Sequence, residues 1–233
     1  MKISLVTRTK NEAKELYELG RILTLQSVQP LEVIVIDNNS EDNSRNVASE
    51  FDYKILTTDD YLPGKALNLG MEIAKGDFVA IVSSHCIPTN SDWLANLIAP
   101  FNSDDTIAGV YGRQLPTKAS SANDYRDLFT VFGPEKKTQT KDVFFHNANS
   151  AIRRSIWQDI PFSSTATNIE DRIWAKAVLE ANYKIIYTPD AAVFHPHGIN
   201  HDGNQMRAAK VVEVCKTQRL YEHRHDEDWF NKK

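Results

Sequence analysis

Cysteine is scarce in this chain of 233 residues, which contains only Cys86 and Cys215. Two cysteines cannot build the disulfide framework of a small secreted protein, nor a zinc site with four cysteine ligands. Long apolar runs are also lacking, and no stretch approaches the roughly 18 residues that a membrane-spanning helix needs. Residues 1–7 interleave polar and apolar side chains, unlike the apolar core of a signal peptide. We therefore expect a cytoplasmic protein that touches, at most, the inner face of a membrane.

An excess of positive charge is absent as well. The 27 lysine and arginine residues are opposed by 31 aspartate and glutamate residues, which gives a formal charge of −4. Nucleic-acid-binding domains usually carry a basic excess, because they bind by neutralising phosphates. We therefore expect no nucleic-acid partner. The composition, 41% hydrophobic and 25% charged, is that of an ordinary globular protein with a full core.

The first half of the chain alternates predicted strands with predicted helices. Short apolar runs with strand character occupy residues 2–7, 31–36, 53–57 and 77–83. Segments with helical periodicity follow them at residues 12–28, 42–51, 64–75 and 91–101. Such alternation predicts an α/β fold with a mostly parallel central sheet and helices on both faces. In such a sheet, ligands bind at the carboxyl ends of the strands.

The second half of the chain is less regular. A strand is predicted at residues 107–111, but residues 112–142 are polar and lack clear periodicity, which indicates a functional loop or a mobile segment. Helices are then predicted at 170–182 and 203–221, and short strands at 184–187 and 191–194. Because we find no internal repeat and no linker rich in proline, glycine or serine, we expect one domain over residues 1–233.

Polar residues follow three of the predicted strands. These strand ends read Thr7-Arg8-Thr9-Lys10-Asn11-Glu12, Asp37-Asn38-Asn39-Ser40 and Ser84-His85-Cys86. Each of them alone is typical of turns and helix caps. Three such ends at the same edge of one sheet could, however, build a single crevice.

These segments resemble family 2 glycosyltransferases of the GT-A fold. The resemblance begins with SLVTRTKNEAKELYELGRILTLQSVQPLEVIVIDNNSEDNS and continues through GKALNLGMEIAKGDFVAIVSSHCIP. It resumes at NANSAIRRSIW and at IEDRIWAKAVLEANYKIIYTPDAAVFHPHG. It thus covers roughly residues 2–110 and 145–198. It implies a nucleotide-binding half at 1–110, an acceptor and catalytic half at 111–200, and a C-terminal helix within 201–233.

The resemblance implies a nucleotide-sugar donor at the strand ends. The implied donor-binding residues are Thr7, Thr9, Glu12, Asp37, Asn39, Lys65, Asn68, Ser83 and Ser84. By this resemblance, Thr7 and Glu12 would flank the nucleotide base. The Asp37 carboxylate would accept a hydrogen bond from the imide N–H of the base. Because uracil carries an imide proton, this contact favours a UDP-sugar. Lys65 and Asn68 would lie beside the diphosphate at a helix N-terminus. The alternative for Lys65 is a solvated surface lysine.

The expected metal motif is altered. The family usually has Asp-x-Asp, which holds Mg²⁺ or Mn²⁺, where this chain has Ser83-Ser84-His85. The resemblance suggests His195 or His197 as further ligands beside His85. Imidazole suits Mn²⁺ or another transition metal better than Mg²⁺. The alternative is a metal-independent site in which Lys65, Arg153 or Arg154 neutralises the diphosphate.

The resemblance also implies an inverting transfer with a carboxylate base. Asp171 matches the base of the family's Glu-Asp pair, and Glu170 would orient it, although an acidic first helical turn is common without catalysis. Asn147, Asn149, Arg153 and Trp174 fall where the family lines the sugar pocket, while a tryptophan in the core is an equal alternative for Trp174.

We therefore expect an enzyme that adds one sugar to a glycan or glycolipid acceptor, in surface polysaccharide or glycolipid biosynthesis. The Gln-x-x-Arg-Trp signature of processive synthases is absent. One alternative is a nucleotidyltransferase, although this chain lacks the glycine-rich loop that such an enzyme would be expected to have. The other alternative is a binding or scaffold module with a degenerate metal site. The segment 201–233 could contact a membrane surface, pack on the domain or form a homodimer.

Overall fold

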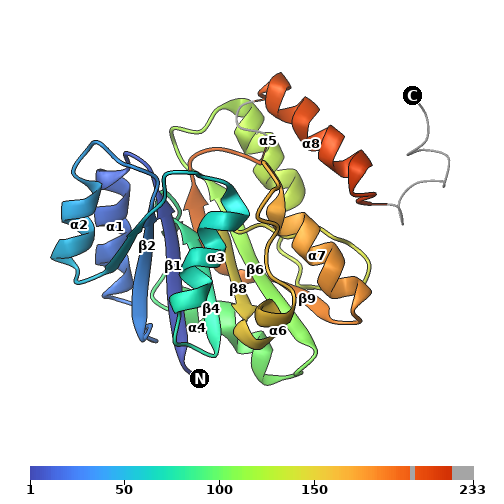
Figure 1. Ribbon diagram of the computed structural model, residues 1–233, viewed down its shortest axis with the longest axis horizontal. Helices are drawn as coiled ribbons and strands as arrows, with labels where there is room; N and C mark the ends of the chain where they lie inside the picture. Colours follow the sequence, from blue (N-terminus) through green and yellow to red (C-terminus); the bar gives the residue numbers. More distant parts are fainter. Residues whose placement is uncertain (200–202, 222–233) are drawn as a thin grey trace.

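The computed structural model describes residues 1–199 and 203–221, in which one nine-stranded sheet is flanked by helices (Figure 1). The strands are β1 (Ile3–Thr9), β2 (Glu32–Asp37), β3 (Lys54–Thr57), β4 (Phe78–Ser83), β5 (Ile87–Pro88), β6 (Ile107–Pro116), β7 (Lys137–Gln139), β8 (Asn149–Arg153) and β9 (Lys184–His195). The helices are α1 (Ala13–Leu23), α2 (Ser44–Glu50), α3 (Pro63–Ile73), α4 (Trp93–Ile98), the 3₁₀ turn η1 (Ala99–Asn102), α5 (Ala122–Val131), α6 (Arg154–Asp159), α7 (Glu170–Glu180) and α8 (Gln205–Thr217).

The strand order is β3-β2-β1-β4-β8-β6-β9-β5, and β7 pairs with β9. Strands β1 to β4 are parallel to one another, β8 is antiparallel to both β4 and β6, and β6 is parallel to β9. The carboxyl ends of β1, β2, β4, β6 and β9 therefore meet the amino end of β8 at one edge of the sheet. We call this edge the carboxyl edge.

Helices cover both faces of the sheet, as the strand–helix alternation predicted. On one face, a core cluster joins Leu67 of α3, Leu128 of α5, Trp157 of α6 and Trp174 of α7. On the other face, a second cluster includes Leu19 of α1 with the apolar side chains of α4. Helix α1 buries Leu16, Leu19, Gly20 and Leu23, which recur at helical spacing. The predicted α/β class with a mostly parallel sheet is confirmed.

The prediction of an irregular segment at residues 112–142 is wrong. Strand β6 continues to Pro116, and the segment then forms α5 and β7. Helix α5 escaped detection because its buried positions are Asp124, Asp127 and Leu128, so it lacks an apolar stripe. Its Ser121 accepts a hydrogen bond from Asp124 N–H and caps the helix in the usual way. The two short strands expected at 184–187 and 191–194 are one continuous strand, β9.

Helix α8 represents the predicted C-terminal helix and lies beyond β9. It buries none of its residues fully, but Val211, Val214 and Cys215 pack against the core. Residues 200–202 and 222–233, which include part of the segment considered for membrane contact, lie outside the described residues. Within the described chain, no helix has the length and apolar character to span a bilayer.

Candidate functional site

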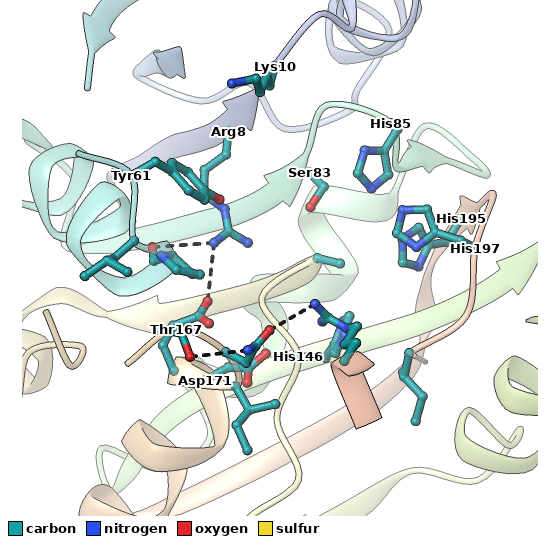
Figure 2. Close-up of a pocket in the computed structure, with 18 of the residues that line it drawn as sticks. Arg8, Lys10, Tyr61, Ser83, His85, His146, Thr167, Asp171, His195 and His197 are labelled. Atoms are coloured by element: carbon teal, nitrogen blue, oxygen red, sulfur yellow. Dashed lines mark hydrogen bonds and ion pairs between the residues drawn. The ribbon is translucent and has the colours of Figure 1, made fainter. Parts of the chain in front are cut away.

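A cavity of about 630 Å³ opens at the carboxyl edge of the sheet. Its walls come from strand ends and from the loops that follow them, including Arg8 and Thr9 of β1, Ser83 of β4 and His195 of β9. Helix α7 contributes Glu170 and Asp171, and α8 contributes Arg207 and Val211. Figure 2 shows three histidines gathered on one side of the cavity, with Arg8 and Asp171 on another. A cavity of this size accommodates a ligand of several hundred cubic ångströms.

Three histidines converge in this cavity from two strand ends. His85 lies in the turn after β4, His195 is the last residue of β9, and His197 follows it by two residues. Their ligand nitrogens all lie within 4.8 Å of one another. The ring centroids are 5.3 Å apart for His85 and His195, and 4.9 Å apart for His85 and His197. Such convergence of imidazole nitrogens is the arrangement that a divalent transition metal needs.

Two of these histidines are oriented by hydrogen bonds. His195 places Nδ1 2.8 Å from Oε1 of the buried Gln114, whose amide nitrogen lies 2.9 Å from Nδ1 of His146. His85 places Nδ1 2.7 Å from Oε1 of Glu12. A ring held at Nδ1 in this way directs Nε2 toward a metal. The donor set therefore fits a cation that accepts imidazole, such as Mn²⁺, Co²⁺ or Zn²⁺, and suits Mg²⁺ poorly because Mg²⁺ requires oxygen ligands.

The Glu170–Asp171 pair begins α7 and is buried. Ile169, in the left-handed region at φ 50°, turns the chain so that both carboxylates enter the cavity wall. Asp171 accepts hydrogen bonds from the backbone N–H groups of Asn147 (3.2 Å) and Arg172 (2.8 Å). Burial and the neighbouring Glu170 carboxylate raise the pKa of Asp171 to about 7. A carboxylate with that pKa matches the requirement for a general base near neutral pH.

Positive side chains surround this carboxylate pair. Arg8 Nη1 lies 3.3 Å from Glu170 Oε1, which also accepts a hydrogen bond from Asn147 Nδ2. Arg207 of α8 donates to Asn168 Oδ1 at 3.1 Å, and its Nε is buried without a hydrogen-bond partner among the described residues. Together with Lys10, these groups give the cavity positive charge despite the acidic balance of the whole chain.

The structure brings several residues of the predicted set to the cavity. Thr9, Glu12, Ser83, His85, Glu170, Asp171, His195 and His197 line it. Thr9 Oγ1 is buried there and has no hydrogen-bond partner within the described chain. Ser84 is buried beneath the turn, where its hydroxyl donates to the Arg8 carbonyl and to Glu12. Asn147 lies behind the carboxylate pair and holds it, so its contacts differ from the expected contact with a sugar.

Three of the predicted donor-binding residues, Asp37, Asn39 and Thr7, lie outside the cavity lining. The Asp37 carboxylate is buried and accepts hydrogen bonds from Arg45 Nε at 2.7 Å and from Ser40 N–H, whereas its neighbour Asn38 lines the cavity. Asn39 is turned outward, and its Nδ2 donates to Asp59 at 2.9 Å. Thr7 is fully buried within β1. The role of Asp37 toward a base stays a prediction.

Two residues expected beside the diphosphate lie outside the cavity lining. Asn68 is buried between α3 and the loop after α6, where it donates to the Phe162 carbonyl and accepts from Trp157 Nε1. Lys65 is half-buried and its Nζ lies 2.7 Å from Oδ2 of the exposed Asp60, a contact that fits the alternative of a surface lysine.

Three residues expected in the sugar pocket have structural contacts instead. Arg153 lies at the opposite edge of the sheet, because β8 runs antiparallel to β4 and pairs Arg153 with Phe78. Trp174 is buried in the core, and its indole donates to the Ile160 carbonyl at 2.8 Å. Asn149 is fully buried and accepts a hydrogen bond from Trp93 Nε1. Arg154, the other alternative for neutralising the diphosphate, donates to the Met71 carbonyl.

Replacing Asn149 with alanine is expected to lower the free energy of unfolding by about 2–4 kcal/mol. The change would leave Trp93 Nε1–H and the carbonyls of Arg113 and Ala191 buried without their partner. Urea unfolding followed by Trp fluorescence would measure the loss. Asn46→Ala, on the exposed face of α2, is the matched control and should change stability by less than about 0.5 kcal/mol. A fully stable Asn149→Ala protein would contradict the structural role.

Four residues of this site were not among the predicted ones. Arg8 lies in a strand end that the sequence singled out, yet only the folded chain shows that it reaches α7. Gln114 and His146 lie in or near a segment without periodicity, so no sequence signal marked them. Arg207 comes from α8, which follows the last resembling segment and is not part of it.

Known proteins similar to this chain are glycosyltransferases. The profile of Glycosyl transferase family 2 matches residues 4–160. The O-antigen chain rhamnosyltransferase RfbN of Salmonella typhimurium is 30% identical over 211 residues, which cover 84% of this chain and 67% of that protein. The O-antigen chain rhamnosyltransferase WbaN of Salmonella anatum is 30% identical over 185 residues, which cover 74% of this chain and 58% of that protein. The chain thus spans between half and two thirds of the length of these two relatives.

Solved structures show the same fold. The mannosyltransferase PcManGT from Pyrobaculum calidifontis, in complex with GDP-Man and Mn²⁺, has a TM-score of 0.69 at 19% identity and covers 97% of this chain and 65% of that one. Staphylococcus aureus TarS 1–349 in complex with UDP has a TM-score of 0.66 at 19% identity and covers 92% of this chain and 66% of that one. The fold is therefore the GT-A fold, and the chain belongs to glycosyl transferase family 2.

Proposed function

We propose that the chain transfers one sugar from a nucleoside-diphosphate sugar to an acceptor hydroxyl, with inversion at the anomeric carbon. The observation that carries this proposal is the buried Asp171, whose pKa is raised to about 7 in the wall of a cavity that also holds three converging histidines. A base and a charge-neutralising region on different sides of one cavity are what a direct displacement needs. Neither alternative, a nucleotidyltransferase or a scaffold, requires both a base and a charge-neutralising region in one cavity.

Asp171 is the proposed general base. Its carboxylate would take the proton of the acceptor hydroxyl while that oxygen bonds to the anomeric carbon and the bond to the diphosphate breaks. Asn147 N–H holds one carboxylate oxygen and Arg172 N–H the other, so the base is already oriented. Glu170 is engaged by Arg8 and Asn147, which assigns it to positioning the pair.

Positive charge on the other side of the cavity would stabilise the leaving diphosphate. A divalent cation bound by His85, His195 and His197 would supply neutralisation of charge on the diphosphate oxygens. The half-buried Arg8 and the side chains of Lys10 and Arg207 add positive charge to the cavity, with Arg8 and Arg207 on the side of the carboxylate pair. Thr9 Oγ1, a buried hydroxyl without a partner in the described chain, is a candidate hydrogen-bond donor to the donor substrate.

The donor is proposed to be a UDP-sugar and the acceptor a growing surface polysaccharide or glycolipid. Support for the donor class comes from the similar folds, of which TarS is known in complex with UDP and PcManGT with GDP-Man. Support for the acceptor comes from the O-antigen chain rhamnosyltransferases and from TarS, a poly(ribitol-phosphate) β-N-acetylglucosaminyltransferase. A contact with the membrane face or a second copy of the chain stays a prediction.

A screen of nucleotides and nucleotide sugars tests this function. UDP, dTDP and GDP, each with Mn²⁺, would be added to the full chain and the melting temperature measured. The cognate nucleotide at about 100 times its Kd should add about 2.7 kcal/mol of stability, a shift of roughly 5–10 °C. The matching UDP-, dTDP- or GDP-sugars would then be followed for slow donor hydrolysis by ¹H NMR. If no nucleotide stabilises the chain, the proposal is wrong.

A further inference from the structure

We propose that Glu12 is a positioning residue of the three-histidine centre, and that it supplies through His85 the negative charge that Ser83-Ser84-His85 lacks. This inference rests on the cation site of the proposed function. Glu12 lies between β1 and α1, and it contacts a turn that follows it by more than 70 residues. The sequence had suggested Glu12 as a residue beside the nucleotide base, whereas its carboxylate points to the histidine centre.

Both oxygens of the Glu12 carboxylate are engaged by the turn after β4. Oε1 lies 2.7 Å from Nδ1 of His85, and Oε2 accepts a hydrogen bond from the Ser84 hydroxyl. The same Ser84 hydroxyl also contacts the carbonyl of Arg8 at 2.9 Å. Glu12 is therefore held by both carboxylate oxygens against the turn that carries His85.

The geometry places Glu12 behind a ligand and not among the ligands. The three histidine nitrogens lie within 4.8 Å of one another, and no Glu12 oxygen belongs to that group. A carboxylate that accepts the proton of His85 Nδ1 directs Nε2 to the other two rings and increases the basicity of that nitrogen. Three neutral imidazoles would leave a divalent ion with its full charge in a partly buried site. The Glu12 carboxylate, which lies behind His85 and does not bind the ion itself, would reduce the net charge of the centre from +2 to +1.

The loop that carries Glu12 is held firmly by the segment after β2. The backbone N–H of Glu12 donates to Ser44 Oγ at 3.1 Å, and that of Asn11 donates to Ser40 Oγ at 3.0 Å. Asn11 has φ 54°, in the left-handed region, and its side chain accepts from Glu41 N–H at 2.7 Å. These contacts fix the carboxylate against His85 before any cation binds. Orienting partners of metal ligands typically contribute about 10- to 100-fold in metal affinity.

Cation binding without any sugar donor tests this inference. The chelator-treated full chain would be titrated with Co²⁺, and the visible absorption bands of the bound ion would be followed. Glu12→Gln keeps the shape and an acceptor oxygen but removes the charge, so Co²⁺ affinity should fall by about 10- to 100-fold. Glu12→Asp keeps the charge and should lose less. Glu18→Gln, which removes an exposed carboxylate of the same helix region, is the matched control and should leave the affinity unchanged.

A rescue separates a charge effect from a folding effect. Ser83 lines the cavity at the position of the missing first aspartate, so Ser83→Asp in the Glu12→Gln background should recover Co²⁺ affinity. Equal affinity of Glu12→Gln and the unaltered chain would overturn the role of Glu12 while leaving the centre standing. Absence of Co²⁺ bands in the unaltered chain would overturn both the centre and this inference. Donor binding by the unaltered chain would still be measured separately, so the proposed transferase function would be judged on its own.

Discussion

Replacing Asp171 with asparagine is expected to lower kcat by about 10²- to 10⁴-fold and to leave donor binding unchanged. The asparagine has the size of the aspartate and can still accept a hydrogen bond from Asn147 N–H or Arg172 N–H, but it cannot take a proton. Initial rates of nucleotide release, with the donor identified by the screen, measure the loss. The nucleotide-induced rise in melting temperature measures binding in the same preparation.

Glu170→Gln is the matched control for this substitution. Glu170 is the neighbouring buried carboxylate, and its Oε1 accepts hydrogen bonds from Arg8 and from Asn147. A glutamine retains an acceptor oxygen there, so we expect a loss of less than about tenfold, in accord with a positioning role. An Asp171→Asn enzyme that turns over normally would remove Asp171 from the base role. A loss confined to Glu170→Gln would transfer that role to Glu170.

The pH profile gives an independent signature of the same base. Burial and the neighbouring Glu170 raise the pKa of Asp171 to about 7, and only the deprotonated carboxylate can accept the acceptor's proton. The rate should therefore be constant above that pH and fall as pH decreases through it, by about tenfold per unit at the limit. In Asp171→Asn, the residual rate should lose this acidic limb. A wild-type profile that is flat between pH 5 and 8 would contradict the assignment.

The sequence predicted the carboxyl edge of the sheet correctly, because the strand ends are marked by their own polar residues. Alternating apolar runs and helical periods determine a parallel sheet, and a parallel sheet brings its carboxyl ends together. This logic brought the ends of the strands predicted at 2–7 and 77–83 to one edge, where Thr9, Ser83 and His85 line the cavity. Asp171 and His195 were expected from the family resemblance, and they line the same cavity. These positions required no knowledge of side-chain contacts.

The logic failed where a strand reverses. The resemblance implies that Asn147, Asn149 and Arg153 line the sugar pocket together, but β8 is antiparallel to β4. Its first residues therefore approach the carboxyl edge, while Arg153 reaches the opposite edge and packs over Phe78 with 5.1 Å between guanidinium and ring centroid. Strand direction depends on long-range pairing that local periodicity does not encode. Gln114 was missed for a related reason, since a buried polar residue is recognised only by its partners.

Removal of divalent cations is expected to lower the transfer rate by about 10²-fold or more, which corresponds to about 3 kcal/mol of transition-state stabilisation. The three converging imidazoles form the group within the described residues best suited to hold such an ion. Treatment with a chelator, followed by dialysis and addition of single metal salts, measures the effect. Mn²⁺ or Co²⁺ should restore the rate, whereas Mg²⁺ should restore it poorly because this centre offers nitrogen ligands.

His197→Ala is the variant that assigns this response to the centre. His197 lies in the turn after β9, where removal of its ring withdraws one of three ligands without disturbing the bond between His195 and Gln114. The variant should have the low transfer rate of the chelator-treated enzyme, and added Mn²⁺ should raise that rate only slightly. Asn46→Ala, on the exposed face of α2 and outside the cavity lining, serves as the control. If the chelator-treated wild type keeps its full rate, the arginine and lysine side chains that line the cavity, Arg8, Lys10, Arg172 and Arg207, must neutralise the diphosphate without a metal.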